Sequence, residues 1–341
     1  FRSILKATLE YPARFGPQLA DEIRKWGKRW YELVKPKLQP YFSPLPPGAE
    51  GAAYLWARTV ACPSTGKPVP LSPNWWLSKD PPVSVRLVAG EGMQTPRFDI
   101  LKGKPAIASQ PDQGTVSRGV GRSPWTGETI PGDYIKAEAQ AGRMGQMLYA
   151  VATKVPGGFE FRAPTQEDIE ANQRAEQALA TKKPEWIARD IIPSEAFPTG
   201  NDNRPIMYGM PTWADFFSPR QLFSMGVFIK SLIDIQEEAI QELGTSKGKA
   251  VSLLLAIALD KCPNYNSRLS IWHPLRTTMA NTFNRHDFSF SWSHGEFDSS
   301  ANLLPWSLNQ IIDAYKSLAN LAAPLQESYI STKSANSNAL Y

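Results

Sequence analysis

Apolar residues recur three or four positions apart over residues 17–35, which predicts an amphipathic helix near the start of the chain. Pro17 suits the first turn of such a helix, and Pro36 is expected to stop it. The apolar side would consist of Leu19, Ile23, Trp26, Trp30 and Val34.

Three further helices are predicted in the second half of the chain. Ser218 and Gln221 have the spacing of a capping box, and Pro219 suits the first helical position. A helix is therefore expected over 219–243, and Gly244 is expected to end it. Its apolar stripe would be formed by Leu222, Met225, Ile229, Leu232, Ile233 and Ile240. Further helices are expected over 249–261, which is nearly all apolar, and over 306–322, stopped by Pro324.

Two mostly polar stretches precede these helices. The sequence from Thr165 is typical of a helix N-terminus, and a surface helix is expected from there to about Thr181. Four prolines in residues 183–210 predict an extended connection.

Residues 52–162 have a different pattern, with short β-like runs separated by Gly, Pro, Ser and Asp. The clearest runs are 54–60, 83–88 and 148–153, and one helix is expected over 133–146. The predicted class is therefore α+β, with helical segments flanking a small loop-rich β unit. The chain is predicted to divide into four segments. Residues 1–48 and 211–335 are expected to be helical, 49–162 to be the β unit, and 163–210 to contain a helix and the extended connection.

The composition is that of a globular protein, with 42% hydrophobic and 11% aromatic residues in 341. The apolar runs are too short to span a bilayer, so no membrane and a cytoplasmic location are expected. The first 158 residues carry a formal charge of +9 and the remainder −4. A polyanion would therefore approach the front half, although a solvated basic face is the simpler interpretation.

Basic and aromatic residues are interleaved around Trp26–Tyr31 and again over 265–285, a mixture that suits phosphate contact and base stacking. Structural roles compete with this interpretation, because Trp26 and Trp30 also lie at core spacing. The candidate nucleic-acid-binding residues are Arg24, Lys25, Lys28, Arg29, Arg118, Arg122, Arg268 and Arg285.

Two turns share the pattern x-Pro-x-x-Gly, at Cys62–Gly66 and at Ser123–Gly127. A four-cysteine zinc ribbon has two knuckles of this shape, with Cys at the first and fourth places. Only Cys62 is present here, because Thr65, Ser123 and Thr126 stand at the other places, so no metal ligand set and no zinc are expected. Two unrelated loops would give the same pattern.

No catalytic residue is predicted. Asp80-Pro81-Pro82-Val83 is similar to the catalytic loop of adenine methyltransferases, but Val83 cannot stack on a base, so a proline turn is expected. A glycine-rich turn for a methyl donor is not found in the sequence. His273, His286, His294 and Cys262 lie close in sequence at spacings that match no familiar metal site.

The order of several short segments resembles the adenine-specific DNA methyltransferases that contain a zinc-ribbon domain. The matching stretches are Leu5–Phe15, Tyr54–Pro63, Trp76–Lys79, Gly114–Val116, Arg118–Gly119, Ile130–Ile135, Tyr208–Met210, Asp215–Leu222, Tyr265–Ser267, Trp272–Pro274 and Asn281–Phe283. The resemblance implies helices of a split α/β class I methyltransferase core around a zinc-ribbon-like β insertion.

The same resemblance implies that this chain is an internal segment of such an enzyme, an expectation that fits its start at Phe1 without Met. S-adenosylmethionine would be the cofactor of the parent enzyme and would not bind this segment alone. Its partners would be DNA and either the remainder of the methyltransferase core or another protein.

Two alternatives remain open at this point. The chain could be a non-catalytic nucleic-acid-binding or scaffold module of a phage-defence assembly. It could also belong to an RNA-directed or zinc-dependent enzyme, which would need a bound metal.

Overall fold

The computed structural model describes residues 2–200, 202–284 and 287–322, and it has a mixed α and β architecture in which all strand pairs are antiparallel. The chain divides into two compact units. Unit 1 lies within Phe1–Leu38, Val227–Cys262 and Asn302–Tyr341, and unit 2 is formed by Gln39–Gly226 and Pro263–Ala301. These units cut across the four segments predicted from the sequence, because each unit gathers pieces that are distant along the chain.

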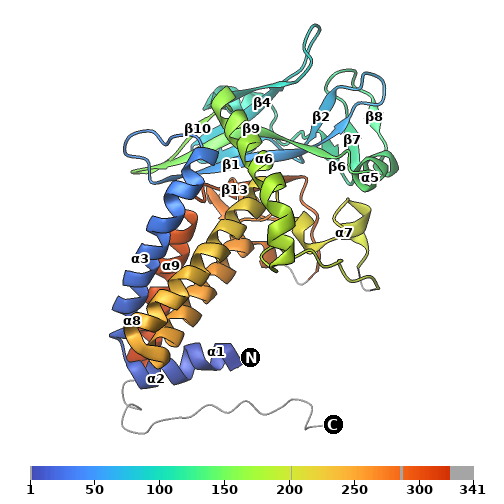
Figure 1. Cartoon of the computed structure of the whole chain (residues 1–341). Coiled ribbons are helices and arrows are strands. Elements are labelled where there is room, and N and C mark those ends of the chain that lie inside the picture. The colour runs from blue at the N-terminus through green and yellow to red at the C-terminus, as the bar shows by residue number, and fades with distance from the viewer. Residues whose placement is uncertain (1, 201, 285–286, 323–341) are drawn as a thin grey trace. The chain divides into compact units, whose positions relative to one another are not determined.

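Unit 1 is helical (Figure 1). Its main helices are α3 (Leu19–Leu38), the central part of α8 (Pro219–Tyr265) and α9 (Leu303–Ala322). The N-terminal segment adds short helices, which are α1 (Arg2–Leu5), the π-helix Lys6–Glu10 and α2 (Tyr11–Phe15).

Helix α3 confirms the predicted amphipathic pattern, since all five predicted apolar positions are buried. The indole Nε1 of Trp30 donates to the carbonyl oxygen of Phe228 at 3.2 Å, and the two rings meet edge to face with centroids 6.2 Å apart. The predicted stop at Pro36 was wrong by two residues, because the helix continues to Leu38. Pro36 lacks the N–H that would donate to the carbonyl of Glu32, so the last turn forms without that bond.

Helix α8 is interrupted where the sequence predicted. Gly244 has φ 76° and ψ 161°, a conformation that glycine adopts without strain. The chain then reverses, since a Cβ atom placed on Gly248 would come within 2.5 Å of the Cα atom of Ile240. Leu222, Met225 and Leu232 of the predicted stripe are buried, Ile229 and Ile240 are partly buried, and Ile233 is exposed.

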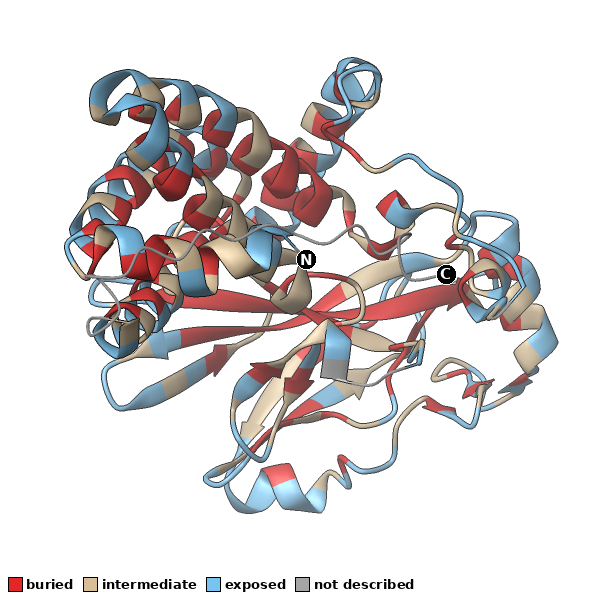
Figure 2. Cartoon of the chain, turned by 90° about the horizontal axis from the view of Figure 1, so that it is seen from below, coloured by how far each residue is buried: buried red, intermediate tan, exposed pale blue. Residues whose placement is uncertain are grey.

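Unit 2 is built on a five-stranded sheet in the order β10-β9-β1-β13, with β2 also paired to β1. The long strand β1 (Gly51–Ala61) is buried almost throughout, as the red ribbon in Figure 2 shows. The other strands are β2 (Pro68–Leu71), β9 (Gly145–Val155), β10 (Gly158–Arg162) and β13 (Ser293–Phe297).

The two faces of β1 differ in chemistry because side chains alternate along a strand. Ala53, Leu55 and Ala57 face an apolar core with the three-stranded sheet β3-β4-β5. The alternate residues Tyr54, Trp56 and Arg58 are also buried, and they carry polar atoms. The bounds of that second sheet are β3 (Trp76–Lys79), β4 (Pro82–Val88) and β5 (Arg97–Lys102).

A smaller core in unit 2 lies under the three-stranded sheet β6-β7-β8. It contains Val60, Cys62, Leu71, Ile130 and Ile135 among its buried members. Its strands are β6 (Val116–Ser117), β7 (Val120–Arg122) and β8 (Thr129–Ile130). The remaining elements of unit 2 are the 3-10 helix Gln39–Tyr41, α4 (Lys104–Ala108), α5 (Gly132–Gln140), α6 (Gln166–Ala188), α7 (Arg204–Met207), the 3-10 helices Trp213–Phe216 and Thr282–Asn284, β11 (Ile271–His273) and β12 (Thr278–Ala280).

Two further predicted helix ends, and the prediction of a surface helix, were wrong. The helix expected over 133–146 ends at Gln140, because Gly145 onward joins the sheet as β9. Helix α6 extends beyond Thr181 to Ala188, so the connection expected over 183–210 is shorter and also contains α7. The polar helix α6 is not wholly at the surface, since it buries Ala171, Asn172, Ala175, Leu179 and Trp186.

Candidate functional site

A cavity of about 820 Å³ lies in unit 2 between the central sheet, the start of β5 and α6. Trp56 of β1 and Met147 and Leu148 of β9 contribute apolar surface, and Phe98 adds an aromatic ring from β5. This is the size of cavity that commonly holds a small organic ligand.

Helix α6 supplies a row of four side chains to this cavity, namely Ile169, Asn172, Gln173 and Glu176. Their spacing of three and four residues places them on one face of the helix. The Nδ2 atom of Asn172 donates to Glu176 Oε1 at 2.8 Å, which fixes the orientation of the Asn172 amide.

The N-terminus of α6 is held by a dense set of hydrogen bonds. The backbone nitrogen of Asp168 donates to Thr165 Oγ1 at 3.3 Å, and the Asp168 carboxylate accepts from the backbone nitrogen of Thr165 at 2.7 Å. The same carboxylate accepts from Arg162 Nη2 at 2.8 Å and from Ser43 Oγ at 2.7 Å. Burial opposes the charge, but these donors more than offset it and lower the Asp168 pKa to about 2.

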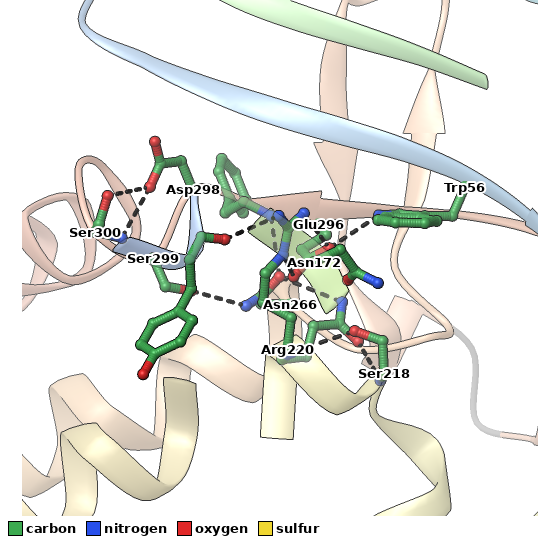
Figure 3. Close-up of polar contacts among 12 residues, drawn as sticks. Trp56, Asn172, Ser218, Arg220, Asn266, Glu296, Asp298, Ser299 and Ser300 are labelled. Atoms are coloured by element: carbon green, nitrogen blue, oxygen red, sulfur yellow. Dashed lines mark hydrogen bonds and ion pairs between the residues drawn. The ribbon is translucent and has the colours of Figure 1, made fainter. Parts of the chain in front are cut away.

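Trp56 is positioned by a buried ion pair (Figure 3). Its Nε1 atom donates to Glu296 Oε2 at 2.9 Å, while Arg220 Nε and Nη2 contact the two oxygens of Glu296 at 2.8 and 2.9 Å. The side chains of Arg220 and Glu296 are both fully buried. Burial disfavours the Arg220 charge, yet Glu296 outweighs this and keeps the Arg220 pKa above its usual value.

Aromatic rings surround the Arg220 guanidinium and complete its environment. Its central carbon lies 4.5 Å from the Phe42 ring centroid, 4.3 Å from that of Tyr54 and 5.7 Å from that of Trp56. Nη1 donates to the carbonyl oxygen of Tyr41 at 3.1 Å. Paired bidentate geometry of this kind fixes the side chains it joins, so Trp56 presents a rigid surface to the cavity.

Two amide groups in the cavity have unused hydrogen-bonding atoms. Asn172 Oδ1 and Gln146 Nε2 are buried, and neither meets a partner among the described residues. One is an acceptor and the other a donor. Buried amide atoms without partners cost free energy, so a ligand that reached them after a rotation of the two side chains, and supplied the complementary donor and acceptor, would gain affinity there.

The rim of the cavity at β5 carries charge that is already paired. Arg86 Nη2 donates to Asp99 Oδ2 at 2.7 Å, and Arg97 Nε donates to Asp99 Oδ1 at 3.0 Å. The hydrogen bond from Arg86 is the main reason that the Asp99 pKa is lowered. The rim therefore offers little free charge.

The four basic residues predicted on α3 are exposed, and each faces a carboxylate. Arg24 contacts Asp21 at 2.8 Å, and Lys28 contacts Glu32 at 3.8 Å. Lys25 pairs with Glu242, and Arg29 pairs with Glu238 at 2.5 Å. Exposed ion pairs of this kind are weak and could be exchanged for contacts with phosphate. Phosphate contact by these four residues therefore stays a prediction. The neighbouring carboxylates nevertheless offset much of the positive charge on this face of the helix.

The other predicted binding residues belong to unit 2 and differ in exposure. Arg118 and Arg122 are exposed on the β6-β7 hairpin. Arg268 is partly buried, and its Nη1 donates to the carbonyl oxygen of Asp215 at 3.3 Å while its Nε is enclosed. Arg268 therefore points inward, contrary to the expectation of a surface contact. Arg285 lies outside the described residues.

The interleaved segment 265–285 contributes to a second cavity, of about 510 Å³. Phe197, Trp213, Phe216 and Phe288 line it, and the Phe283 ring at its edge is 73% exposed. This aromatic cavity could accept a stacked ring or a proline-rich peptide.

The two x-Pro-x-x-Gly turns, residues 62–67 and 123–128, face each other and are called the paired turns below. Their backbone bonds match: the nitrogens of Gly66 and Gly127 donate to the carbonyl oxygens of Cys62 and Ser123 at 2.8 and 2.9 Å. Gly66 and Gly127 have φ values of 69° and 75°. The two loops therefore share their turn geometry and contact each other, whereas their relation to the knuckles of a zinc ribbon stays a prediction.

The paired turns are joined by a hydrogen-bond network centred on Glu128. Cys62 Sγ lies 3.2 Å from Ser123 Oγ and donates to Glu128 Oε1 at 2.8 Å. The backbone nitrogen of Ser64 donates to the same oxygen at 3.2 Å, and Ser64 Oγ donates to Glu128 Oε2. These donors, with Cys62 first, lower the Glu128 pKa.

Neither a metal site nor a membrane-spanning helix is found among the described residues. No group of three or more His, Cys, Asp or Glu side chains is placed to hold a metal ion among the residues that the structure describes. None of the described helices is both long and apolar enough to cross a membrane. Asp80 and Pro81 form the tight turn between β3 and β4, and Pro82 and Val83 begin β4, which confirms the predicted proline turn.

Comparison with known proteins found no match: no family model, no curated protein and no solved structure resembles the chain. The case for function therefore depends on the geometry of the site.

Sequence reasoning missed the cavity residues Trp56, Gln146 and Asn172. Each lies in a stretch that was expected to be structural or at the surface, and they meet only through the pairing of β1 with β9 and the packing of α6. The available signal was Asn172, a polar residue that follows Ala171 on the face that α6 buries.

Proposed function

We propose that this chain is the DNA-contacting part of an adenine-specific DNA methyltransferase that uses S-adenosylmethionine, and that its amide-lined cavity binds an unstacked base. The observation that supports this most is the pair of unsatisfied amide atoms beside Trp56. An exposed adenine edge offers an amino donor next to a ring-nitrogen acceptor. Asn172 Oδ1 would accept from the amino group, and Gln146 Nε2 would donate to the ring nitrogen.

The cavity also suits the remainder of a base. Trp56, Phe98 and Met147 supply apolar and aromatic surface, and a base removed from its stack needs such contacts to offset the cost of unstacking. A cavity of about 820 Å³ has room for a nucleoside. In this proposal the helices belong to a split methyltransferase core. The paired turns belong to a zinc-ribbon-like insertion that lacks its metal.

The test compares single-stranded oligonucleotides that contain one adenine or one abasic site in a thymine background. We expect the unsubstituted protein to prefer the adenine strand by about tenfold, since one lost bidentate contact costs about 1–3 kcal/mol. Asn172→Leu should remove the preference and keep the residual, sequence-independent affinity. Gln177→Leu, on an exposed position of α6 outside the cavity, is the matched control. Equal affinity of the unsubstituted protein for both strands would refute the proposal.

A second candidate is a non-catalytic binding module, and the aromatic cavity favours it. Trp213 and Phe283 are exposed at that cavity, and exposed rings of this size commonly mark a binding surface. Phe283→Ser would then weaken binding of nucleic acid or of a partner, while the adenine preference at Asn172 would be unchanged.

A further inference from the structure

Arg58 is fully buried in unit 2 and lacks a full set of partners. Its Nε donates to the carbonyl oxygen of Ser291 at 2.9 Å, and its Nη2 lies 3.8 Å from Met210 Sδ. The guanidinium stacks 4.4 Å from the Phe290 centroid. Nη1 has no partner, and no carboxylate pairs with Arg58 among the described residues.

His294 lies beside Arg58 on the same face of the sheet. Trp56 of β1 lies opposite His294 of β13 in the antiparallel register. The backbone nitrogen of Arg58 donates to the carbonyl oxygen of Trp292 at 2.9 Å. Opposite residues share a face, so Arg58 and His294 are diagonal neighbours. His294 is 1% exposed, and both its ring nitrogens lack partners in the described part of the chain.

Arg268 adds a third nitrogen-bearing group, near enough for its charge to lower the pKa of both Arg58 and His294. The loop that carries it is joined to β13, since the nitrogen of Gly295 donates to the carbonyl oxygen of Ser270 at 2.8 Å. Its Nε is buried without a partner. Burial, followed by the charges of Arg58 and Arg268, lowers the His294 pKa, so His294 is neutral and can donate one N–H.

The carboxylates near this cluster are already engaged. Glu296 holds Arg220 and Trp56. Burial lowers the Arg268 pKa to about 10, and Asp215 offsets only part of this effect. The Asp215 carboxylate itself accepts from the nitrogen and hydroxyl of Thr212 at 2.8 and 2.6 Å. An arginine keeps its proton, and leaving its charge buried without a counter-ion is costly.

We infer that Arg58, Arg268 and His294 form an internal binding site for a small inorganic anion of halide size. Their three unsatisfied N–H groups would donate to the anion, and the positive charge of Arg58 would be balanced. Phe290 and Met210 lie against the Arg58 guanidinium and are polarisable and weakly polar. Such surroundings favour the binding of a halide over that of a strongly hydrated phosphate.

The first experiment replaces sodium gluconate by sodium chloride at constant ionic strength and follows thermal unfolding. Above saturation we expect the midpoint to rise by about 3–5 °C for each tenfold increase in chloride, as mass action on the folded state requires. Crystals grown in bromide should show an anomalous peak beside Arg58 Nη1. A midpoint that is indifferent to chloride together with no bromide peak would overturn the inference.

A variant separates a specific site from a general salt effect. Met210→Glu places a carboxylate where Arg58 Nη2 now meets sulfur, and it should be tolerated while abolishing the chloride dependence. Met279→Glu, buried among apolar side chains, is the control and should be strongly destabilising. Equal destabilisation by both substitutions would count against the site, as would a chloride dependence that survives Met210→Glu.

Discussion

Asp168 is a fully buried carboxylate that Arg162, Ser43 and Thr165 hold in its charged form. Its pKa of about 2 lies below the ordinary value of 3.8, so the folded state binds this proton less tightly than the unfolded chain. The group therefore stabilises the fold above about pH 4, and this contribution is lost as the pH falls toward 2.

We predict that Asp168→Asn lowers the free energy of unfolding by about 2 kcal/mol at pH 7 and that this difference shrinks between pH 4 and pH 2. Denaturant unfolding across this range measures both effects. Asp21→Asn, which removes an exposed carboxylate of α3, is the control and should change stability little. A difference that stays constant down to pH 2 would show that the buried carboxylate does not carry the effect.

At the scale of single elements, local sequence signals were sufficient to predict several boundaries. The caps at Thr165 and Ser218 and the break at Gly244 depend on neighbouring residues only, and the structure confirms all three. The end of α5 was not predicted, because the residues from Gly145 onward form a strand that pairs with β1. The pairing of Trp56 with Leu148 and His294 is non-local, and no local pattern specifies it.

The paired turns test the resemblance to a zinc ribbon at the level of one element. Thr65, Ser123 and Thr126 stand at the three places where cysteines would complete a set with Cys62, and the two turns already face each other. We predict that Thr65→Cys, Ser123→Cys and Thr126→Cys together create a tetrahedral thiolate site.

Cobalt substitution gives the readout, because a four-thiolate Co²⁺ site has intense charge-transfer and ligand-field absorption. The triple variant should bind one equivalent, and the same variant with Cys62→Ser added should bind far more weakly. Absence of the tetrahedral spectrum in the triple variant would mean that the turns only share a backbone shape.

At the scale of the whole molecule, net charge does not tell which basic residues are free of carboxylate partners. The basic residues of α3 are ion-paired, and Arg268 points into unit 2. Of the predicted binding residues that the structure describes, Arg118 and Arg122 are exposed and form none of the described ion pairs. Composition reports how many charges there are, whereas the fold decides which are free.

Phosphate contacts by Arg118 and Arg122 alone predict a shallow salt dependence for binding of single-stranded DNA. Two phosphate contacts give a slope of about −1.4 in log affinity against log salt, or about a sevenfold loss between 50 and 200 mM. Titrations by fluorescence anisotropy at several salt concentrations measure the slope. Arg118→Gln with Arg122→Gln should flatten it, and a loss of several orders of magnitude would require a much larger cationic surface.

The central claim is that Asn172 and Gln146 recognise an adenine in the cavity beside Trp56. The most direct measurement is the ¹⁵N side-chain amide NMR spectrum of the whole chain during titration with a single-stranded oligonucleotide. We predict that the amide signals of Asn172 and Gln146 shift with a strand containing adenine and stay in place with the matched abasic strand. Unchanged Asn172 and Gln146 signals at saturating adenine strand would contradict the account.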